Sequence, residues 1–245
     1  MTARQQAPSR AAASRGIATF CLLAIAALPF LCKGAVVAVG LTGYLWQSLY
    51  KVFQLAGPVG WRRQQGRPWL ASFWPVDQPL PDRRTWAMAV VLAAVLAGTA
   101  IAAANILAPR LGLQPETIRA DLDQRFAMTP LRAVLVVLYL LSINAALEEL
   151  HFRAWLDGEL SSRWGGAVGI MVSALAFAAM HVFIFAGGAG ASSTALVLVF
   201  LALAIAGVCW SLLARRRGGI HAAWLSHGLT DATLLAWGLF WLGYF

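Results

Sequence analysis

Charged residues are scarce in this chain. Only 12% of its 245 residues are Asp, Glu, Lys or Arg, whereas 60% are hydrophobic. A soluble domain usually carries about 25% charged residues, so this composition excludes an ordinary soluble domain. Alternating strand patterns are also missing, and the apolar runs are far longer than the roughly ten residues of a membrane-barrel strand. Because only helices and closed barrels satisfy every backbone polar group in lipid, we expect an all-α, polytopic transmembrane helix bundle with about 6–8 spanning helices.

Cysteine is equally scarce. Cys21, Cys32 and Cys209 all lie inside apolar runs, and no Cys-x-x-Cys spacing is present. This pattern argues against a cysteine metal site or a disulfide framework. It predicts instead that the three thiols are small residues of the protein interior.

The apolar runs give the expected order of the helices. Spans of about twenty residues, the length that crosses a bilayer, begin near Trp86, Leu131, Gly166, Thr194 and Gly219. The first apolar region, 17–50, is too long for one span and is interrupted by Pro29 and by Lys33-Gly34. It predicts either a hairpin of two short spans or one tilted helix with an interfacial extension. We prefer the hairpin, because it places the N-terminal arginines on the same side as the other basic segments.

Basic residues outnumber acidic ones, 19 to 10, and they gather between the apolar runs. One cluster lies in the segment 51–84, which is also rich in Trp and Pro, and contains Lys51, Arg62, Arg63, Arg67, Arg83 and Arg84. The other is 215–217, which is three consecutive arginines. Basic loops mark the cytoplasmic side of a membrane protein. We therefore expect an inner (plasma) membrane protein whose basic loops face the cytoplasm and whose partners are membrane lipids rather than nucleic acid.

A few acidic and histidine side chains lie inside the predicted spans, where most residues are apolar, and their presence there requires an explanation. Glu148, Glu149 and Asp231 lie within predicted spans, whereas the other acidic residues lie in loops or at helix ends. A charge in the bilayer costs roughly 2.5–3.5 kcal/mol on insertion scales and therefore points to a function. Pairs that only hold helices together are the structural alternative.

Helix geometry places the acidic residues and the histidines of the spans at a similar depth in the membrane. If 131–163 and 166–185 form an antiparallel pair that turns at Gly165, Glu148 is level with His181. His227 reaches a similar depth on the last helix, and Asp231 follows it at i+4 on the same face. Successive residues on a helix diverge by about 100°, so the two glutamates have different roles.

Glu149 has a partner on its own helix. Arg153 follows it at i+4, the spacing of a helical ion pair. Glu148 is then left to face the histidines, where it could act as a general base.

Three motifs carry a resemblance to a known family. Glu148-Glu149-x-x-x-Arg153, Phe177-x-x-x-His181 and His227-x-x-x-Asp231 follow one another in this order on three predicted spans. Together they resemble the CPBP family, the CAAX prenyl endopeptidases and their bacteriocin-processing (Abi) relatives. The resemblance covers about 131–235 and implies a catalytic core (129–245). Charge and hydropathy divide the rest into a basic cytoplasmic N-terminus (1–16) and N-terminal transmembrane helices with an interfacial loop (17–128).

The resemblance implies an intramembrane endopeptidase that cleaves a membrane-associated protein or peptide at the cytoplasmic side. Glu148 and His181 would activate the attacking water, and His227 and Asp231 would stabilise the oxyanion, with Glu149, Arg153 and Phe177 in support. No cofactor is favoured. Zinc held by Glu148, His181 and His227 is the alternative, because two histidines and a glutamate form a known catalytic zinc shell. The substrate stays open between prenylated C-termini, bacteriocin leaders and sorting tags.

This chain departs from the family pattern at Asp231, where Asn is usual; an ionised carboxylate is a poor oxyanion partner. Three other functions were weighed. Glu148-x-x-His151 has di-iron spacing, but a second copy of the motif is missing. A proton-coupled transporter would use similar buried residues, although no inverted repeat is visible. The third is a non-catalytic membrane scaffold or immunity protein.

Overall fold

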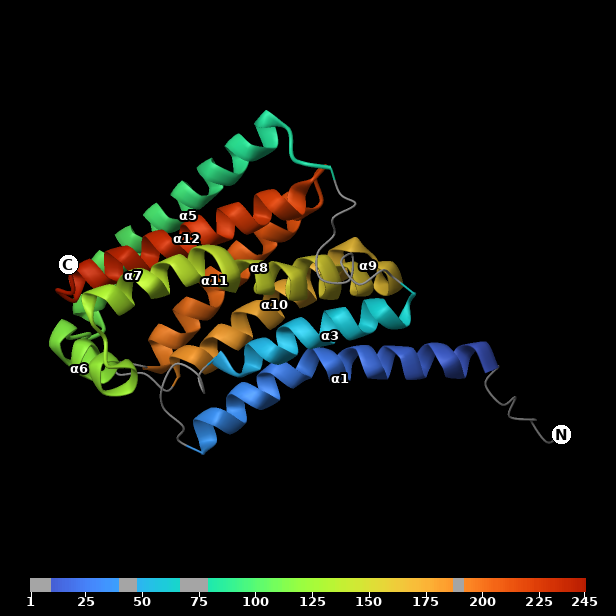
Figure 1. The fold of residues 1–245 in the computed structure, drawn as a ribbon, viewed down its shortest axis with the longest axis horizontal. Helices are drawn as coiled ribbons and strands as arrows, with labels where there is room; N and C mark the ends of the chain where they lie inside the picture. The colour runs from blue at the N-terminus through green and yellow to red at the C-terminus, as the bar shows by residue number, and fades with distance from the viewer. Residues whose placement is uncertain (1–9, 40–47, 67–78, 187–191) are drawn as a thin grey trace.

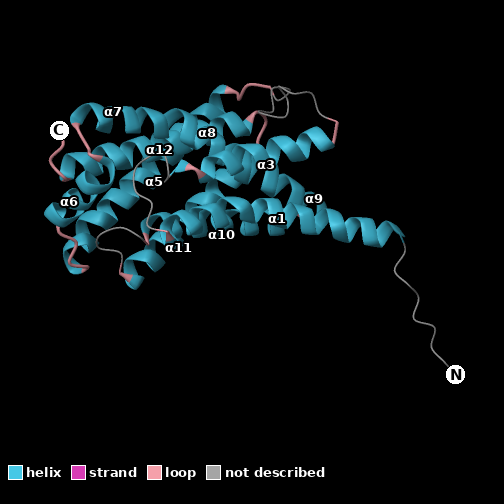
Figure 2. Ribbon diagram, turned by 60° about the horizontal axis from the view of Figure 1, so that its bottom comes forward, coloured by secondary structure: helices cyan, strands magenta, loops and turns pink. Residues whose placement is uncertain are grey.

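The computed structural model describes residues 10–39, 48–66, 79–186 and 192–245. Within these ranges the chain forms helices and turns and no strand (Figures 1 and 2). The elements are α1 (Arg10–Ala38), α3 (Tyr50–Gln64), α5 (Arg83–Arg110), α6 (Pro115–Phe126), α7 (Pro130–Tyr139), η1 (Leu140–Asn144), α8 (Ala145–Glu148), η2 (Glu149–Asp157), α9 (Gly158–Trp164), α10 (Gly166–Phe185), α11 (Ser193–Ala214) and α12 (Gly219–Trp241).

The expected all-α membrane bundle is confirmed. Of the described residues, five helices are long and apolar enough to cross a membrane: Ala18–Val36, Arg83–Arg110, Pro130–Trp164, Gly166–Phe185 and Ser193–Ala214. Helix α12 has 23 residues and packs along α5 (Figure 1), but it is not among the five. The histidines, the aspartate and the small polar residues of α12 lower its mean hydropathy. Some of these residues belong to the candidate site described below.

The preferred hairpin within 17–50 is wrong. Helix α1 runs without a break through Pro29 and Lys33-Gly34 as far as Ala38. The returning arm is α3, which lies antiparallel to α1 (Figure 1), and a Cβ added at Gly57 would lie 2.7 Å from Ile25 Cγ2. The connecting residues 40–47 lie outside the described part of the chain. The antiparallel pair is therefore formed by α1 and α3, and not within 17–50.

Helix α3 also occupies part of the segment in which an interfacial loop was expected. Residues 51–64 of the basic segment 51–84 are helical, and α3 packs against η2 and α8 with Trp61 buried. Residues 67–78, which include the other two tryptophans of this segment, lie outside the described residues. The cysteine prediction is also wrong for Cys21, which is exposed on the apolar surface of α1, while Cys32 and Cys209 are half-buried.

Residues 130–164 form one continuous helix that contains two π-helical segments, η1 and η2. π-helical turns leave carbonyl groups displaced from the regular α-helical ladder. Ser142 O in η1 accepts a hydrogen bond from Trp224 Nε1 on α12 at 2.9 Å. Next to it, α12 approaches so closely that a Cβ at Gly228 would lie 2.2 Å from Leu141 O. The helix pair is thus fixed in register one residue away from His227.

A tight turn reverses the chain between α9 and α10. Gly165 has φ 91°, a conformation that residues with a Cβ rarely adopt. Arg215, which follows α11, closes the same end of the bundle: its Nη2 donates to Asp157 Oδ1 at 2.5 Å and to Ser161 Oγ at 2.7 Å. The end of α3 lies here too, because Gln65 Nε2 donates to Glu159 Oε1 of α9 at 3.1 Å. A Cβ at Gly218 would lie 2.3 Å from Pro79 O, so the chain just before α5 is close to the 215–217 arginines. These ends of the basic segments thus share one face of the bundle.

Candidate active site

Glu148, the last residue of α8, is buried, with 1% of its surface exposed. Its Oε2 atom lies 3.4 Å from His227 Nε2 on α12 and 3.8 Å from His181 Nε2 on α10. Oε2 has no hydrogen-bond partner in the structure. Three helices thus direct one unpartnered carboxylate oxygen and two imidazole nitrogens toward a common point.

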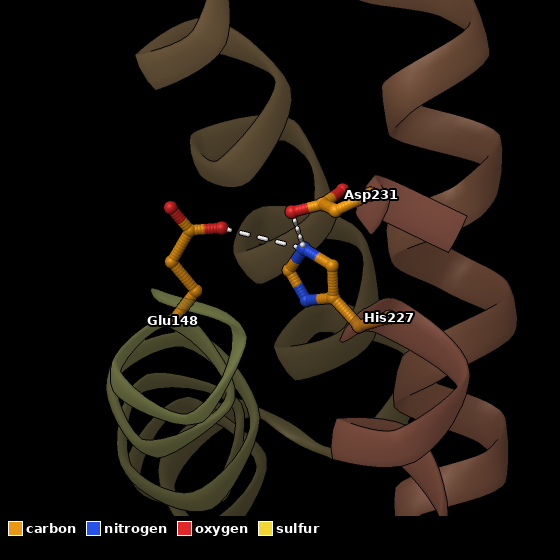
Figure 3. Close-up of side chains that lie close together, drawn as sticks. All are labelled: Glu148, His227 and Asp231. Carbon is orange, nitrogen blue, oxygen red and sulfur yellow. Dashed lines mark ion pairs between the residues drawn. The ribbon is translucent and has the colours of Figure 1, made fainter. Parts of the chain in front are cut away.

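His227 is fully buried and contacts three carboxylates. Its Nδ1 lies 2.8 Å from Glu149 Oε1, and its Nε2 lies 3.4 Å from both Glu148 Oε2 and Asp231 Oδ2. Figure 3 shows Glu148 and Asp231 approaching the same ring nitrogen from opposite helices. Ionised carboxylates only accept hydrogen bonds. The ring therefore donates from Nδ1 to Glu149, whereas Nε2 has no hydrogen-bond partner and faces the oxygens of Glu148 and Asp231.

The two adjacent glutamates differ in role, as their helical spacing predicts, but both reach His227. Glu148 faces Nε2 and Glu149 binds Nδ1. Glu149 also forms the expected i,i+4 ion pair with Arg153, with 3.2 Å between Oε1 and Nη1 and both side chains fully buried. Glu149 is thus an orienting group for the imidazole, in addition to the partner of Arg153.

Aromatic rings enclose this charged cluster. Trp210 of α11 stacks on the His227 ring, with 4.2 Å between centroids and 16° between planes. Phe177 packs edge-on against Trp210 and His227, and Arg153 Cζ lies 4.4 Å from the Phe177 centroid. These π-faces stabilise the buried cations and exclude water from this side of the site. Trp210 was not predicted, because an aromatic residue in an apolar span carries no sequence signal of its own.

His181 has a defined tautomer. Its Nδ1 lies 2.9 Å from the carbonyl oxygen of Phe177, one turn earlier on α10. A carbonyl oxygen only accepts, so Nδ1 carries the proton and Nε2 of the neutral ring offers a lone pair toward Glu148. The His181 side chain is 14% exposed, whereas that of His227 is fully buried. His181 therefore lies on the side from which the site can be reached.

Lys51 is the other residue that the sequence prediction missed. It was counted among the cytoplasmic loop charges, but it lies in the first turn of α3 and is 7% exposed. Its Nζ donates to Glu148 Oε1 in a buried ion pair. The one sequence signal was its position directly after the apolar region 17–50. Glu148 faces the two histidines as expected, but it also has a cationic partner on another helix.

Three donor atoms are close enough to hold a metal ion. Ligand atoms of Glu148, His227 and Asp231 all lie within 4.8 Å of one another. This set differs from the predicted zinc set, because Asp231 takes the place of His181. One histidine and two carboxylates are ligands that zinc accepts, so the donor chemistry is compatible with a metal.

The comparison with protein families agrees with this geometry. The model described as type II CAAX prenyl endopeptidase Rce1-like matches residues 130–233. Residues 130–233 are thus similar to the Rce1-like family. The resemblance to the CPBP family is confirmed, and this Rce1-like region contains Glu148, Glu149, His181, His227 and Asp231. Neither the curated proteins nor the solved structures contain a match to the chain.

Five apolar helices and the similarity of residues 130–233 to this endopeptidase family indicate a multi-pass membrane protein. The Rce1-like region begins at Pro130, the first residue of α7, and ends shortly after Asp231. It leaves out α1, α3 and α5, and with them Lys51. One charged contact of Glu148 therefore comes from a part of the chain that the family model does not describe.

Proposed function

We propose that the protein is an intramembrane endopeptidase in which Glu148 activates a water molecule. One observation carries this proposal: Glu148 Oε2 is buried and unpartnered, and it faces the Nε2 atoms of two histidines. A carboxylate flanked by imidazoles can perform general acid–base catalysis without a covalent intermediate. Similarity to a prenyl endopeptidase family supports hydrolysis of a peptide bond as the reaction.

The attacking water would lie between Glu148 and His181. Their facing atoms are 3.8 Å apart, too far for a direct hydrogen bond. Both atoms accept hydrogen bonds, so a water molecule between them can donate one proton to each. Glu148 Oε2 takes a proton as the water oxygen attacks the carbonyl carbon. It then returns this proton to the amine nitrogen when the carbon–nitrogen bond breaks.

His227 would stabilise the negative charge that develops on the carbonyl oxygen. In its imidazolium form the ring would donate from Nε2 on the side of Glu148 on which the reaction occurs, and Glu149 holds the ring in place through Nδ1. Asp231, 23% exposed at its side chain, lies beside the same nitrogen. In its protonated form Asp231 donates a second hydrogen bond to the oxyanion, which is the task of the Asn that is usual at this position.

Zinc remains the alternative mechanism. Glu148, His227 and Asp231 would hold the ion, and the metal would supply a Lewis acid that activates water at neutral pH. Lys51 argues for the metal-free mechanism, because its ammonium already compensates the Glu148 carboxylate. A divalent cation on the other oxygen would lie close to this positive charge.

We propose that the substrate is a membrane-associated protein or peptide and that cleavage occurs on the cytoplasmic side of the inner membrane. The family description favours a prenylated C-terminus. The basic segments at one end of the bundle support the orientation.

A glutamine at position 148 tests the proposal. The purified protein in lipid vesicles is given fluorogenic membrane peptides, with and without a prenyl group, and cleavage is followed by mass spectrometry. Glu148→Gln should reduce kcat by about 10²- to 10⁴-fold, because it removes the base. The matched control is Glu159→Gln on α9, which should keep full activity. A Glu148→Gln protein with more than roughly a tenth of wild-type turnover would contradict the assignment of the base.

A further inference from the structure

Lys51 reaches the candidate site from outside the Rce1-like region. It lies on α3, 97 residues before Glu148 in the sequence, and its Nζ binds Glu148 Oε1. The two side chains are 8% and 1% exposed. Helix α3 runs along the 130–164 helix from this contact, with Arg62 Nη2 donating to Ala154 O at 2.8 Å further on. The position of Lys51 is therefore set by a helix–helix interface, not by a flexible side chain at the surface.

The surroundings of Lys51 compensate for the burial of its charge. Its Nζ lies 4.8 Å from the centroid of the Tyr50 ring, and Lys33 Nζ of α1 lies 5.6 Å from the same centroid. Tyr50 is buried, with 6% of its surface exposed. An aromatic face attracts cations most strongly where water is excluded. Tyr50 thus provides an aromatic face for the ammonium group.

The two oxygens of Glu148 have different surroundings. Oε1 is bound to Lys51, whereas Oε2 has no hydrogen-bond partner and faces both imidazoles. A glutamate side chain can rotate about three torsions, and a terminal carboxylate torsion is broad. Anchoring one oxygen removes this freedom and selects the other oxygen for the reaction.

A purely structural ion pair explains this arrangement less well. Two charges removed from water at this depth lose solvation that their attraction barely restores, so a buried pair is weak support for stability. An apolar pair would hold α3 on the bundle equally well. The charged pair is explained if Lys51 is needed to hold the Glu148 carboxylate in one orientation.

We propose that Lys51 is a positioning residue for peptide-bond hydrolysis, in which its ammonium group holds Glu148 Oε1 so that Oε2 is aimed at the attacking water and the histidines. This inference rests on the proposed endopeptidase function. It extends the site to α3 and makes the N-terminal helices part of the catalytic arrangement.

Turnover of two Lys51 variants tests the positioning role. Lys51→Met keeps the length of the side chain and removes the charge. It should lower kcat by roughly 10²-fold, the loss expected from about 1 Å of misplacement, with little change in KM, because Lys51 does not touch the substrate. Lys51→Arg keeps a cation and should restore a clear part of kcat. Lys33→Met is the matched control: it removes the other buried ammonium beside Tyr50 and should keep most of the turnover.

Thermal unfolding tests the ion pair without reference to activity. Lys51→Met leaves Glu148 buried and uncompensated, so its melting temperature should fall below that of the wild type. Adding Glu148→Gln to this variant removes the uncompensated charge and should recover most of the lost melting temperature, which is non-additive behaviour.

A Lys51→Met protein that keeps more than half of the wild-type kcat would overturn the proposal. So would a Lys51→Met/Glu148→Gln protein whose loss of melting temperature equals the sum of the losses in the two single variants. If the wild type cleaves none of the peptides, the proposed function fails, whereas the unfolding cycle still decides whether Lys51 and Glu148 are coupled. The two failures are therefore distinguishable.

Discussion

His227 Nδ1 lies 2.8 Å from Glu149 Oε1, and this contact joins the imidazole of α12 to the ion pair of η2. Glu149 thus compensates two cationic groups, His227 and Arg153, at a point where every partner is fully buried. The glutamate next to the proposed base therefore determines whether the site can assemble.

Glu149→Gln should destabilise the protein strongly. It leaves Arg153 without its anion, and removing one partner of a buried pair typically costs about 3–5 kcal/mol. The measurement is the yield of folded protein and the free energy of unfolding in detergent. Glu159→Gln is the control, because Glu159 and Arg163 have the same i,i+4 spacing but are 18% and 23% exposed at their side chains. That change should cost less than about 1 kcal/mol. If both variants lost the same free energy of unfolding, burial of the Glu149–Arg153 ion pair would be unimportant.

Asp231→Asn separates the two mechanisms. In the metal-free mechanism the amide is a permanent donor of the same shape, so hydrolysis should persist and should not respond to a chelator. In the zinc mechanism Asp231 belongs to the cluster of donor atoms around the metal. Metal affinity should then fall by at least the roughly 10- to 100-fold seen for outer partners, and turnover should depend on added zinc. An inactive variant that zinc does not restore would count against both.

Gly228→Ala should disrupt the contact between α12 and η1. The added Cβ would lie 2.2 Å from Leu141 O, a backbone atom that cannot move aside alone. Overpacking of this kind costs about 1–3 kcal/mol and would displace His227 next to it. Gly238→Ala on the same helix is the control, since a Cβ there has nothing within 4 Å and alanine improves helix propensity. Melting temperature and kcat should both fall for Gly228→Ala only.

The orientation can be measured with single cysteines at two exposed positions, Gln65 after α3 and Ser192 before α11. The background must lack the native thiols, because Cys21 is exposed on the apolar surface. In intact cells a membrane-impermeant maleimide should label the cysteine at 192 and spare the one at 65. The reverse pattern would place the basic segments, and the proposed active site, on the outside.

Much of the fold follows from local pattern. The long helices that begin at Arg83, Pro130, Gly166, Ser193 and Gly219 all start within three residues of the expected positions, whereas α6 was not expected. The turn at Gly165 was anticipated as well. Because an antiparallel pair with a known turn fixes which residues are level, the sequence alone predicts the approach of Glu148 to His181.

The rest depends on contacts that sequence spacing does not encode. Pro29 and Lys33-Gly34 suggested an interruption, but the neighbouring α3 buries Lys33 and α1 continues. Lys51 was interpreted as a loop charge, because the direction of α3 was unknown. Nor does the sequence reveal the π-helical turns, which shift the register of η1 and η2 against α12 and so help both glutamates to reach one imidazole.

The attachment of Glu148 to α3 restricts how this protein can be divided or recombined. A fragment that begins at residue 129 would contain every position that the family model matches, yet its glutamate would lack the ammonium group. Exchanging the N-terminal helices between relatives would likewise preserve activity only where the donor supplies a cation at the same depth. The region matched by sequence similarity is therefore shorter than the smallest part of the chain that could work as the proposed enzyme after transfer to another protein.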